Sequence, residues 1–181
     1  MLIVHIISTQ DTKDFEKIYD GMLSDSGVSI LINPSKPSLF QEIIKEKNMI
    51  VFIGHGTEYG LLDRSLDEYI IDSKMVQHLR GKKIVGIWCN ASTFASKYDL
   101  EGFFTSMFMS NSEELLACGF SLFDDCDTEI TKENKLFSTR LNELLKGKRD
   151  IKQLADILRE SSADSRHRFV HYNYEALYSS E

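Results

Sequence analysis

Short apolar runs alternate with amphipathic segments along most of this chain. The runs at residues 2–7, 28–32, 49–53 and 83–88 have the length of strands, and segments with apolar residues at helical spacing separate them. Such alternation is typical of parallel strands joined by crossover helices. It predicts an α/β fold in three layers, in which a mostly parallel central sheet is flanked by helices.

The length of the chain is sufficient for one compact domain. A core in a protein of 181 residues buries roughly 70% of the surface that the unfolded chain exposes. The sequence contains no internal repeat, no low-complexity tract and no linker. We therefore expect a single domain over residues 1–181.

Local signals predict the first helices. Asp11 offers a cap for an amphipathic helix at residues 11–24, and Ser38 with Gln41 has the spacing of a capping box at the head of a second helix. The glycines and charges of residues 54–73 indicate a loop that contains a small hairpin.

The second half of the chain predicts one more strand and several helices. An aromatic run at residues 103–109 indicates a fifth strand, and Asn111 caps a helix that ends at Gly119. Asp150 caps the last helix, whereas the tail from Ser161 onward has no clear pattern.

Composition excludes several classes of function. The net charge of −7 disfavours non-specific nucleic-acid binding, and no apolar stretch is long enough to span a membrane. The N-terminus lacks the features of a signal peptide, and the cysteines have neither disulfide-framework nor zinc-site spacing. We expect a cytoplasmic protein with no metal and no cofactor. The three cysteines are Cys89, Cys118 and Cys126.

Two residues that carry chemistry follow successive predicted strands. His55 lies in Gly54-His55-Gly56 directly after the third strand, and Cys89 directly follows the fourth. The carboxyl ends of parallel strands meet at one edge of the sheet, where ligands bind. An imidazole that accepts the thiol proton turns cysteine into a nucleophile, while N–H groups at Gly56 and Cys89 could bind the oxyanion. The pair predicts acyl transfer without a metal.

Each of these residues also has an ordinary structural interpretation. A lone buried cysteine is most often an inert small hydrophobe, and a histidine between glycines is often a loop residue. The same applies to His167 and His171, which lie four residues apart without further metal ligands, and to the acidic loop at residues 124–127. Only the joint placement of His55 and Cys89 favours catalysis.

These motifs resemble the caspase-like clan of cysteine peptidases, most of all its CHAT domains, with separase, clostripain and the gingipains more distant. The likeness covers residues 49–161. It implies a caspase-like fold in which His55 is the catalytic histidine, Cys89 the nucleophile and Gly56 an oxyanion-hole glycine.

The resemblance also has implications for the substrate. Relatives commonly bind the substrate as an extra strand along the segment after the fifth strand, here residues 109–112. Glu113 falls near the acidic position that favours a basic residue before the cleaved bond. Its alternative interpretation is a first-turn charge that complements the helix dipole.

Two functions from different classes are compatible with the sequence. The first is a cysteine endopeptidase with a peptide or protein substrate, and with a protein partner that activates it if residues 54–73 must be ordered. The second is a non-catalytic caspase-like or flavodoxin-like module that binds a partner or a ligand. Neither interpretation involves nucleic acid or a membrane.

Overall fold

The computed structural model describes residues 1–22, 24–162 and 165–180. These residues form an α/β fold whose centre is a six-stranded sheet in the order β2-β1-β3-β7-β8-β9. All neighbouring strands are parallel except β8 and β9, which are antiparallel. This confirms the predicted class. The strands are β1 (Leu2–His5), β2 (Ser29–Ile32), β3 (Met49–Ile53), β7 (Lys83–Ile87), β8 (Gly102–Thr105) and β9 (Leu177–Ser179).

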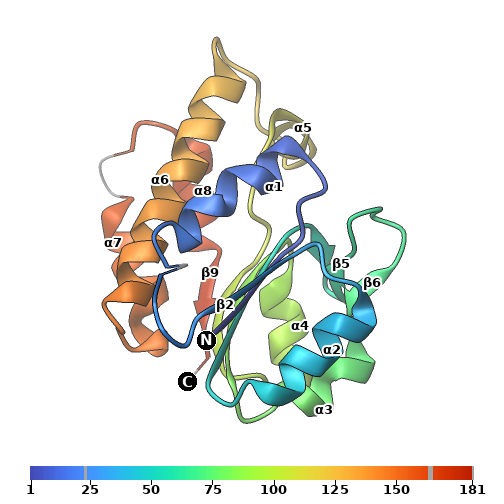
Figure 1. Ribbon diagram of the computed structural model, residues 1–181. Coiled ribbons are helices and arrows are strands. Elements are labelled where there is room, and N and C mark those ends of the chain that lie inside the picture. The colour runs from blue at the N-terminus through green and yellow to red at the C-terminus, as the bar shows by residue number, and fades with distance from the viewer. Residues whose placement is uncertain (23, 163–164, 181) are drawn as a thin grey trace.

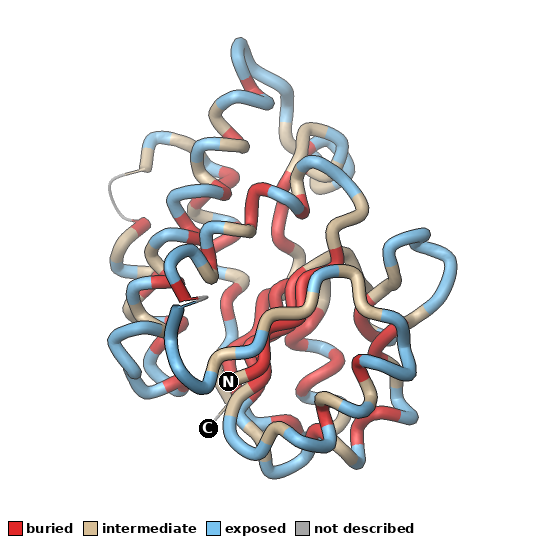
Figure 2. The backbone as a smooth tube through the Cα atoms, in the orientation of Figure 1, coloured by how far each residue is buried: buried red, intermediate tan, exposed pale blue. Residues whose placement is uncertain are grey.

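Side chains of the central strands alternate between two cores, one on each face of the sheet. Val51 and Val85 pack into one core, whereas their neighbours Phe52 and Ile84 pack into the other. Strands that are buried on both faces read as continuous apolar runs, which explains the sequence pattern. Figure 2 shows these strands as the buried centre of the molecule.

Helices cover both faces (Figure 1). One layer contains α1 (Gln10–Asp14), η1 (Phe15–Tyr19), α6 (Cys126–Lys146), η3 (Ile151–Gln153), α7 (Leu154–Ser161) and α8 (Arg168–Glu175). The other contains α2 (Lys36–Lys45), η2 (Ser73–Met75), α3 (Val76–Leu79) and α4 (Ala91–Tyr98). None of the helices in the described residues is long and apolar enough to cross a membrane.

Two helix starts differ from the prediction. Thr9, not Asp11, is the N-cap of α1, so Asp11 lies inside the first turn with its side chain available for other contacts. Ser35, not Ser38, caps α2, because its side chain accepts the Ser38 N–H at 3.4 Å. Pro37 then lies in the first turn, where a missing N–H costs no hydrogen bond.

The predicted helix at residues 11–24 ends early. The α1 and η1 helices stop at Tyr19, and Gly21 follows with a left-handed φ of 72°. The Asn142 side chain of α6 donates to the carbonyls of Ile18 and Asp20, so it satisfies groups that the helix end leaves open.

The hairpin after β3 is confirmed as a small antiparallel sheet. Its strands are β4 (Gly56–Thr57), β5 (Gly60–Leu62) and β6 (Tyr69–Ile71). The unassigned tail contributes α8 and the edge strand β9. Asn111 caps α5 (Ser112–Ala117) as predicted, since its side chain accepts the Glu114 N–H at 2.9 Å.

Candidate active site

Strand register brings His55 and Cys89 to the same edge of the sheet. Ile53 at the end of β3 pairs with Ile87 at the end of β7. His55 and Cys89 each lie two residues beyond this pair, and the Gly54 N–H continues the pairing by donating to the Ile87 carbonyl at 3.1 Å. The joint placement predicted from the sequence is therefore what the structure shows.

The turn that carries Cys89 is fixed on both sides. The hydroxyl of the fully buried Thr105 accepts the Trp88 N–H at 3.1 Å and donates to the Trp88 carbonyl at 2.8 Å. Asn90 has a φ of 64°, a left-handed conformation that asparagine tolerates better than most residues. Its N–H donates to the Ser106 carbonyl at 3.0 Å. The polar residue after the cysteine thus allows the chain to turn from β7 into α4.

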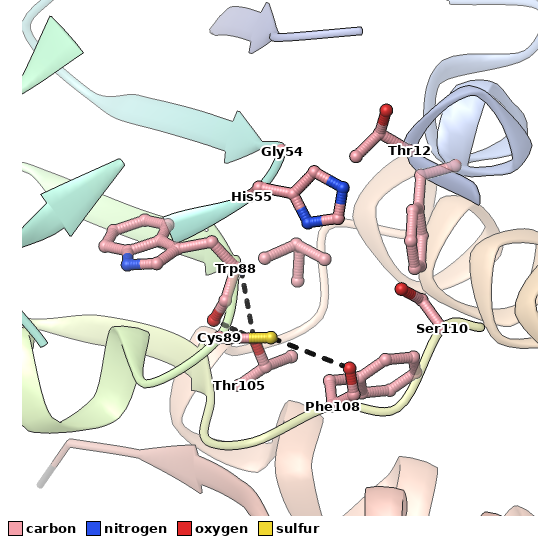
Figure 3. Close-up of a pocket in the computed structure, with 10 residues that line it drawn as sticks. Thr12, Gly54, His55, Trp88, Cys89, Thr105, Phe108 and Ser110 are labelled. Carbon is pink, nitrogen blue, oxygen red and sulfur yellow. Dashed lines mark hydrogen bonds between the residues drawn. The ribbon is translucent and has the colours of Figure 1, made fainter. Parts of the chain in front are cut away.

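His55 and Cys89 line one small cavity (Figure 3). Its volume is about 20 Å³, which is room for about one water molecule. Its other lining residues are Thr12, Phe15, Gly54, Ile87, Trp88, Thr105, Phe108 and Ser110. Among the described residues, no hydrogen bond joins the sulfur to the imidazole. A cavity of this volume is too small to hold a peptide substrate.

The His55 ring is oriented by the first helix. Its Nε2 lies 2.8 Å from Thr9 Oγ1 and 3.6 Å from Asp11 Oδ2. Interaction with the Asp11 side chain raises the pKa of His55 and outweighs the effect of burial, which lowers it. Burial alone would raise the pKa of Asp11, but hydrogen bonds from His55 and from other side chains hold it well below its usual range. Asp11 therefore stays ionised and favours an imidazolium at His55.

The surroundings of Cys89 favour the thiol over the thiolate. Its sulfur lies 3.7 Å from the Phe108 carbonyl oxygen and 3.7 Å from Glu114 Oε1. Burial, followed by the negative charge of Glu114, raises the pKa of Cys89 to about 12. Because only the thiolate is an effective nucleophile, the resting sulfur is unreactive.

One serine joins the carboxylates of the site. The Ser110 hydroxyl lies 2.8 Å from Asp11 Oδ2 and 2.8 Å from Glu114 Oε2, and the Ser110 N–H donates to Glu114 Oε2 at 2.7 Å. Asn111 Nδ2 also donates to Asp11 at 2.9 Å. The segments after β1 and β8 are thus linked directly over the cavity.

Two predicted site residues, Gly56 and Glu113, do not line the cavity. A Cβ on Gly56 would lie 2.2 Å from Trp88 Cδ1 and 2.5 Å from the Gly60 carbonyl oxygen, so glycine is required there for packing. Glu113 lies exposed in the first turn of α5, and Glu114 rather than Glu113 contacts Cys89.

The expected substrate strand along residues 109–112 is wrong for its first half. The Met109 N–H and carbonyl are both bonded to the Asn173 side chain, at 2.8 and 2.9 Å. The Ser110 N–H is bonded to Glu114, and its carbonyl accepts from Asn134 at 2.9 Å. The fifth strand predicted at residues 103–109 is too long: β8 ends at Thr105, and side chains instead of strand pairing hold Met109 and Ser110.

Sequence reasoning missed four polar residues of the site: Thr9, Asp11, Ser110 and Glu114. All four follow strands of the parallel sheet, β1 or β8, at the same edge as His55 and Cys89. The rule that located the histidine and the cysteine could have located them too. For Asp11 the signal is hidden because the residue also has the pattern of a helix cap.

One group of side chains could hold a divalent cation. Ligand atoms of Asp11, His55 and Glu114 all lie within 4.8 Å of one another. The carboxylate oxygens already accept hydrogen bonds from Ser110 and Asn111, so the set is stable as a hydrogen-bonded network.

Comparison with known proteins assigns the chain to no family. No model of a known protein family matches the chain, and no curated protein sequence matches it. The assignment of a function therefore depends on the geometry of the site.

Proposed function

We propose that this protein is a caspase-like cysteine endopeptidase in which His55 and Cys89 form the catalytic dyad. The observation that carries the proposal is the register of β3 and β7, which places both side chains at one cavity at the carboxyl edge of the sheet. A thiol and an imidazole at that position have the chemistry of acyl transfer.

The described residues suggest how the reaction proceeds. Nε2 of His55 is engaged by Thr9 and Asp11, so in the neutral imidazole Nδ1 is the nitrogen that takes the thiol proton. The thiolate attacks the peptide carbonyl, and the imidazolium then gives its proton to the departing amine. Water hydrolyses the resulting thioester and restores the thiol. Asp11 stabilises the imidazolium in both half-reactions.

The charge of the site favours a basic substrate residue before the cleaved bond. Asp11 and Glu114 both lie beside the cavity, and a carboxylate attracts a lysine or arginine side chain strongly where water is partly excluded. The sequence pointed to Glu113 for this role, but Glu114 is the nearer carboxylate to the sulfur. A reducing compartment such as the cytoplasm would keep the thiol available.

A second candidate is a non-catalytic module that binds a partner or a ligand. The small volume of the cavity and the raised pKa of Cys89 favour this alternative. Under the first proposal the same two features describe an enzyme that a protein partner opens and activates.

The test is peptide hydrolysis. Fluorogenic peptides with arginine, lysine or citrulline before the reporter are incubated with the wild type and with Cys89→Ala, His55→Ala and Cys118→Ala variants. We expect hydrolysis of the cationic substrates that is lost in Cys89→Ala and His55→Ala and retained in Cys118→Ala. Hydrolysis that survives in Cys89→Ala would refute the assignment. No hydrolysis by any form, even after partial opening with low urea, would favour the binding module.

A further inference from the structure

A short segment between β8 and α5 covers the sulfur of Cys89 from two sides. We name residues 108–114 the strap. At one end the Phe108 carbonyl oxygen lies 3.7 Å from the sulfur, and at the other end Glu114 Oε1 lies at the same distance. Figure 3 shows Phe108 and Ser110 beside Cys89 at the cavity.

Buried amide side chains hold the strap in place. Asn173 of α8 makes two hydrogen bonds to the backbone of Met109, and Asn134 of α6 donates to the Ser110 carbonyl. Both asparagines are buried, with 3% and 1% of their surfaces exposed. A buried amide that is fully hydrogen-bonded to the backbone fixes a segment, because breaking either bond leaves a polar group unpaired.

The carboxylate of Glu114 lies near the His55 imidazole, within 4.8 Å between ligand atoms, but not in ion-pair contact with it. None of the ion pairs among the described residues includes Glu114, and its Oε2 instead accepts hydrogen bonds from Ser110. The Ser110 hydroxyl can donate its one proton to only one of the two carboxylates, Asp11 or Glu114, at a time. The charge on Glu114 is therefore only partly compensated, and the Cys89 thiol is one of the few donors within its reach.

We propose that the strap is an autoinhibitory element, in which the Phe108 carbonyl and the Glu114 carboxylate engage the sulfur of Cys89 until the strap moves. The inference rests on the proposed function, since it assigns the regulation of that same site. The titratable groups around the sulfur are Glu114 and Cys118 on α5, His55 after β3 and Asp11 on α1. Of these, only Glu114 has an oxygen in contact with the sulfur.

The first experiment removes the charge and keeps the shape. Alkylation of Cys89 by iodoacetamide is followed by peptide mass mapping from pH 6 to 10 in the wild type, in Glu114→Gln and in Glu113→Gln as the matched neighbour. We expect alkylation below pH 9 to accelerate on the order of tenfold in Glu114→Gln, since each unit of pKa changes the thiolate fraction tenfold. Glu113→Gln should match the wild type. An unchanged or slower rate in Glu114→Gln would overturn the proposal.

A second experiment loosens the strap without touching the sulfur or its carboxylate. Asn173→Ala removes two hydrogen bonds to Met109, whereas Asn142→Ala removes two backbone hydrogen bonds from a buried asparagine far from the strap. We expect faster alkylation of Cys89 in Asn173→Ala only. Equal acceleration in both variants would mean general loosening and would overturn the role of the strap. Alkylation of buried Cys126 reports global unfolding in every variant.

Different results would refute the peptidase proposal and the strap proposal. If Glu114→Gln accelerates alkylation but no variant hydrolyses peptides, the restraint is real and the peptidase assignment falls. If the wild type hydrolyses peptides through Cys89 and Glu114→Gln does not accelerate alkylation, the enzyme is real and the restraint falls.

Discussion

Oδ2 of Asp11 lies 3.6 Å from Nε2 of His55, although the two residues belong to segments that follow different strands. The strands concerned, β1 and β3, are neighbours in the sheet. A carboxylate from the first helix thus takes the orienting position behind the candidate base, the arrangement that holds an imidazole in one orientation in many acyl-transfer sites.

Removing this charge should lower the pKa of His55. In Asp11→Asn the imidazolium loses its ionic partner, so burial is no longer outweighed and the ring titrates at a lower pH than in the wild type. The measurement is an NMR titration of the His55 ring protons. Asp20→Asn, at an exposed position in the same part of the chain, is the control. An unchanged His55 titration in Asp11→Asn would contradict the orienting role.

Gly56→Ala tests whether this glycine serves packing or the oxyanion. The added methyl group would collide with the Trp88 ring and with the Gly60 backbone, so we expect a loss of about 1–3 kcal/mol in the free energy of unfolding. Denaturant unfolding followed by Trp88 fluorescence measures this loss. Gly147→Ala, at a helix end with a φ of −70°, should cost less. A stable Gly56→Ala protein with impaired hydrolysis would instead support the oxyanion role.

Thr105→Val should destabilise the turn that presents Cys89. Valine keeps the shape of threonine but leaves the Trp88 N–H without its buried acceptor, which costs about 1–3 kcal/mol. Chemical denaturation gives the free energy of unfolding. The control is Thr139→Val, because the Thr139 hydroxyl donates to its own helix at the surface. Equal costs at both positions would mean that the buried hydrogen bonds are not special.

The sequence predicted those parts of the fold and the site that depend on local patterns. Apolar runs of strand length predicted the sheet, and glycines with charges predicted the hairpin. The rule that ligands bind at the carboxyl edge of a parallel sheet predicted that His55 and Cys89 lie close together. The contacts that hold the end of η1 and the segment after β8 come from Asn142 and Asn173, which lie on helices distant in sequence. Asp11 was expected to be a cap because a local pattern cannot show that the side chain is turned toward His55.

Acid should destabilise the protein through His5, which supports the first helix. His5 is fully buried in β1, where Nε2 donates to the Thr12 carbonyl at 2.8 Å and Nδ1 accepts from the Tyr19 hydroxyl at 3.0 Å. Burial lowers the pKa of His5 from 6.5 to about 4. Between these values the unfolded chain binds a proton that the folded protein does not, so stability falls as the pH falls.

The expected loss is about 3 kcal/mol between pH 6.5 and 4, at about 1.4 kcal/mol per pH unit. Urea denaturation at intervals of half a pH unit measures it. His55 acts in the opposite direction, because its raised pKa contributes stability that is present at low pH and lost as the pH rises. The contribution of Asp11 is lost only below its ordinary pKa of 3.8. His5→Gln, which keeps a polar side chain, should therefore be less stable at pH 7 but lose little further stability down to pH 4. If its stability falls with acid as steeply as that of the wild type, another group causes the loss. Protonation leaves the Nε2–H bond to the Thr12 carbonyl in place, so the expected loss comes from burying a charged ring.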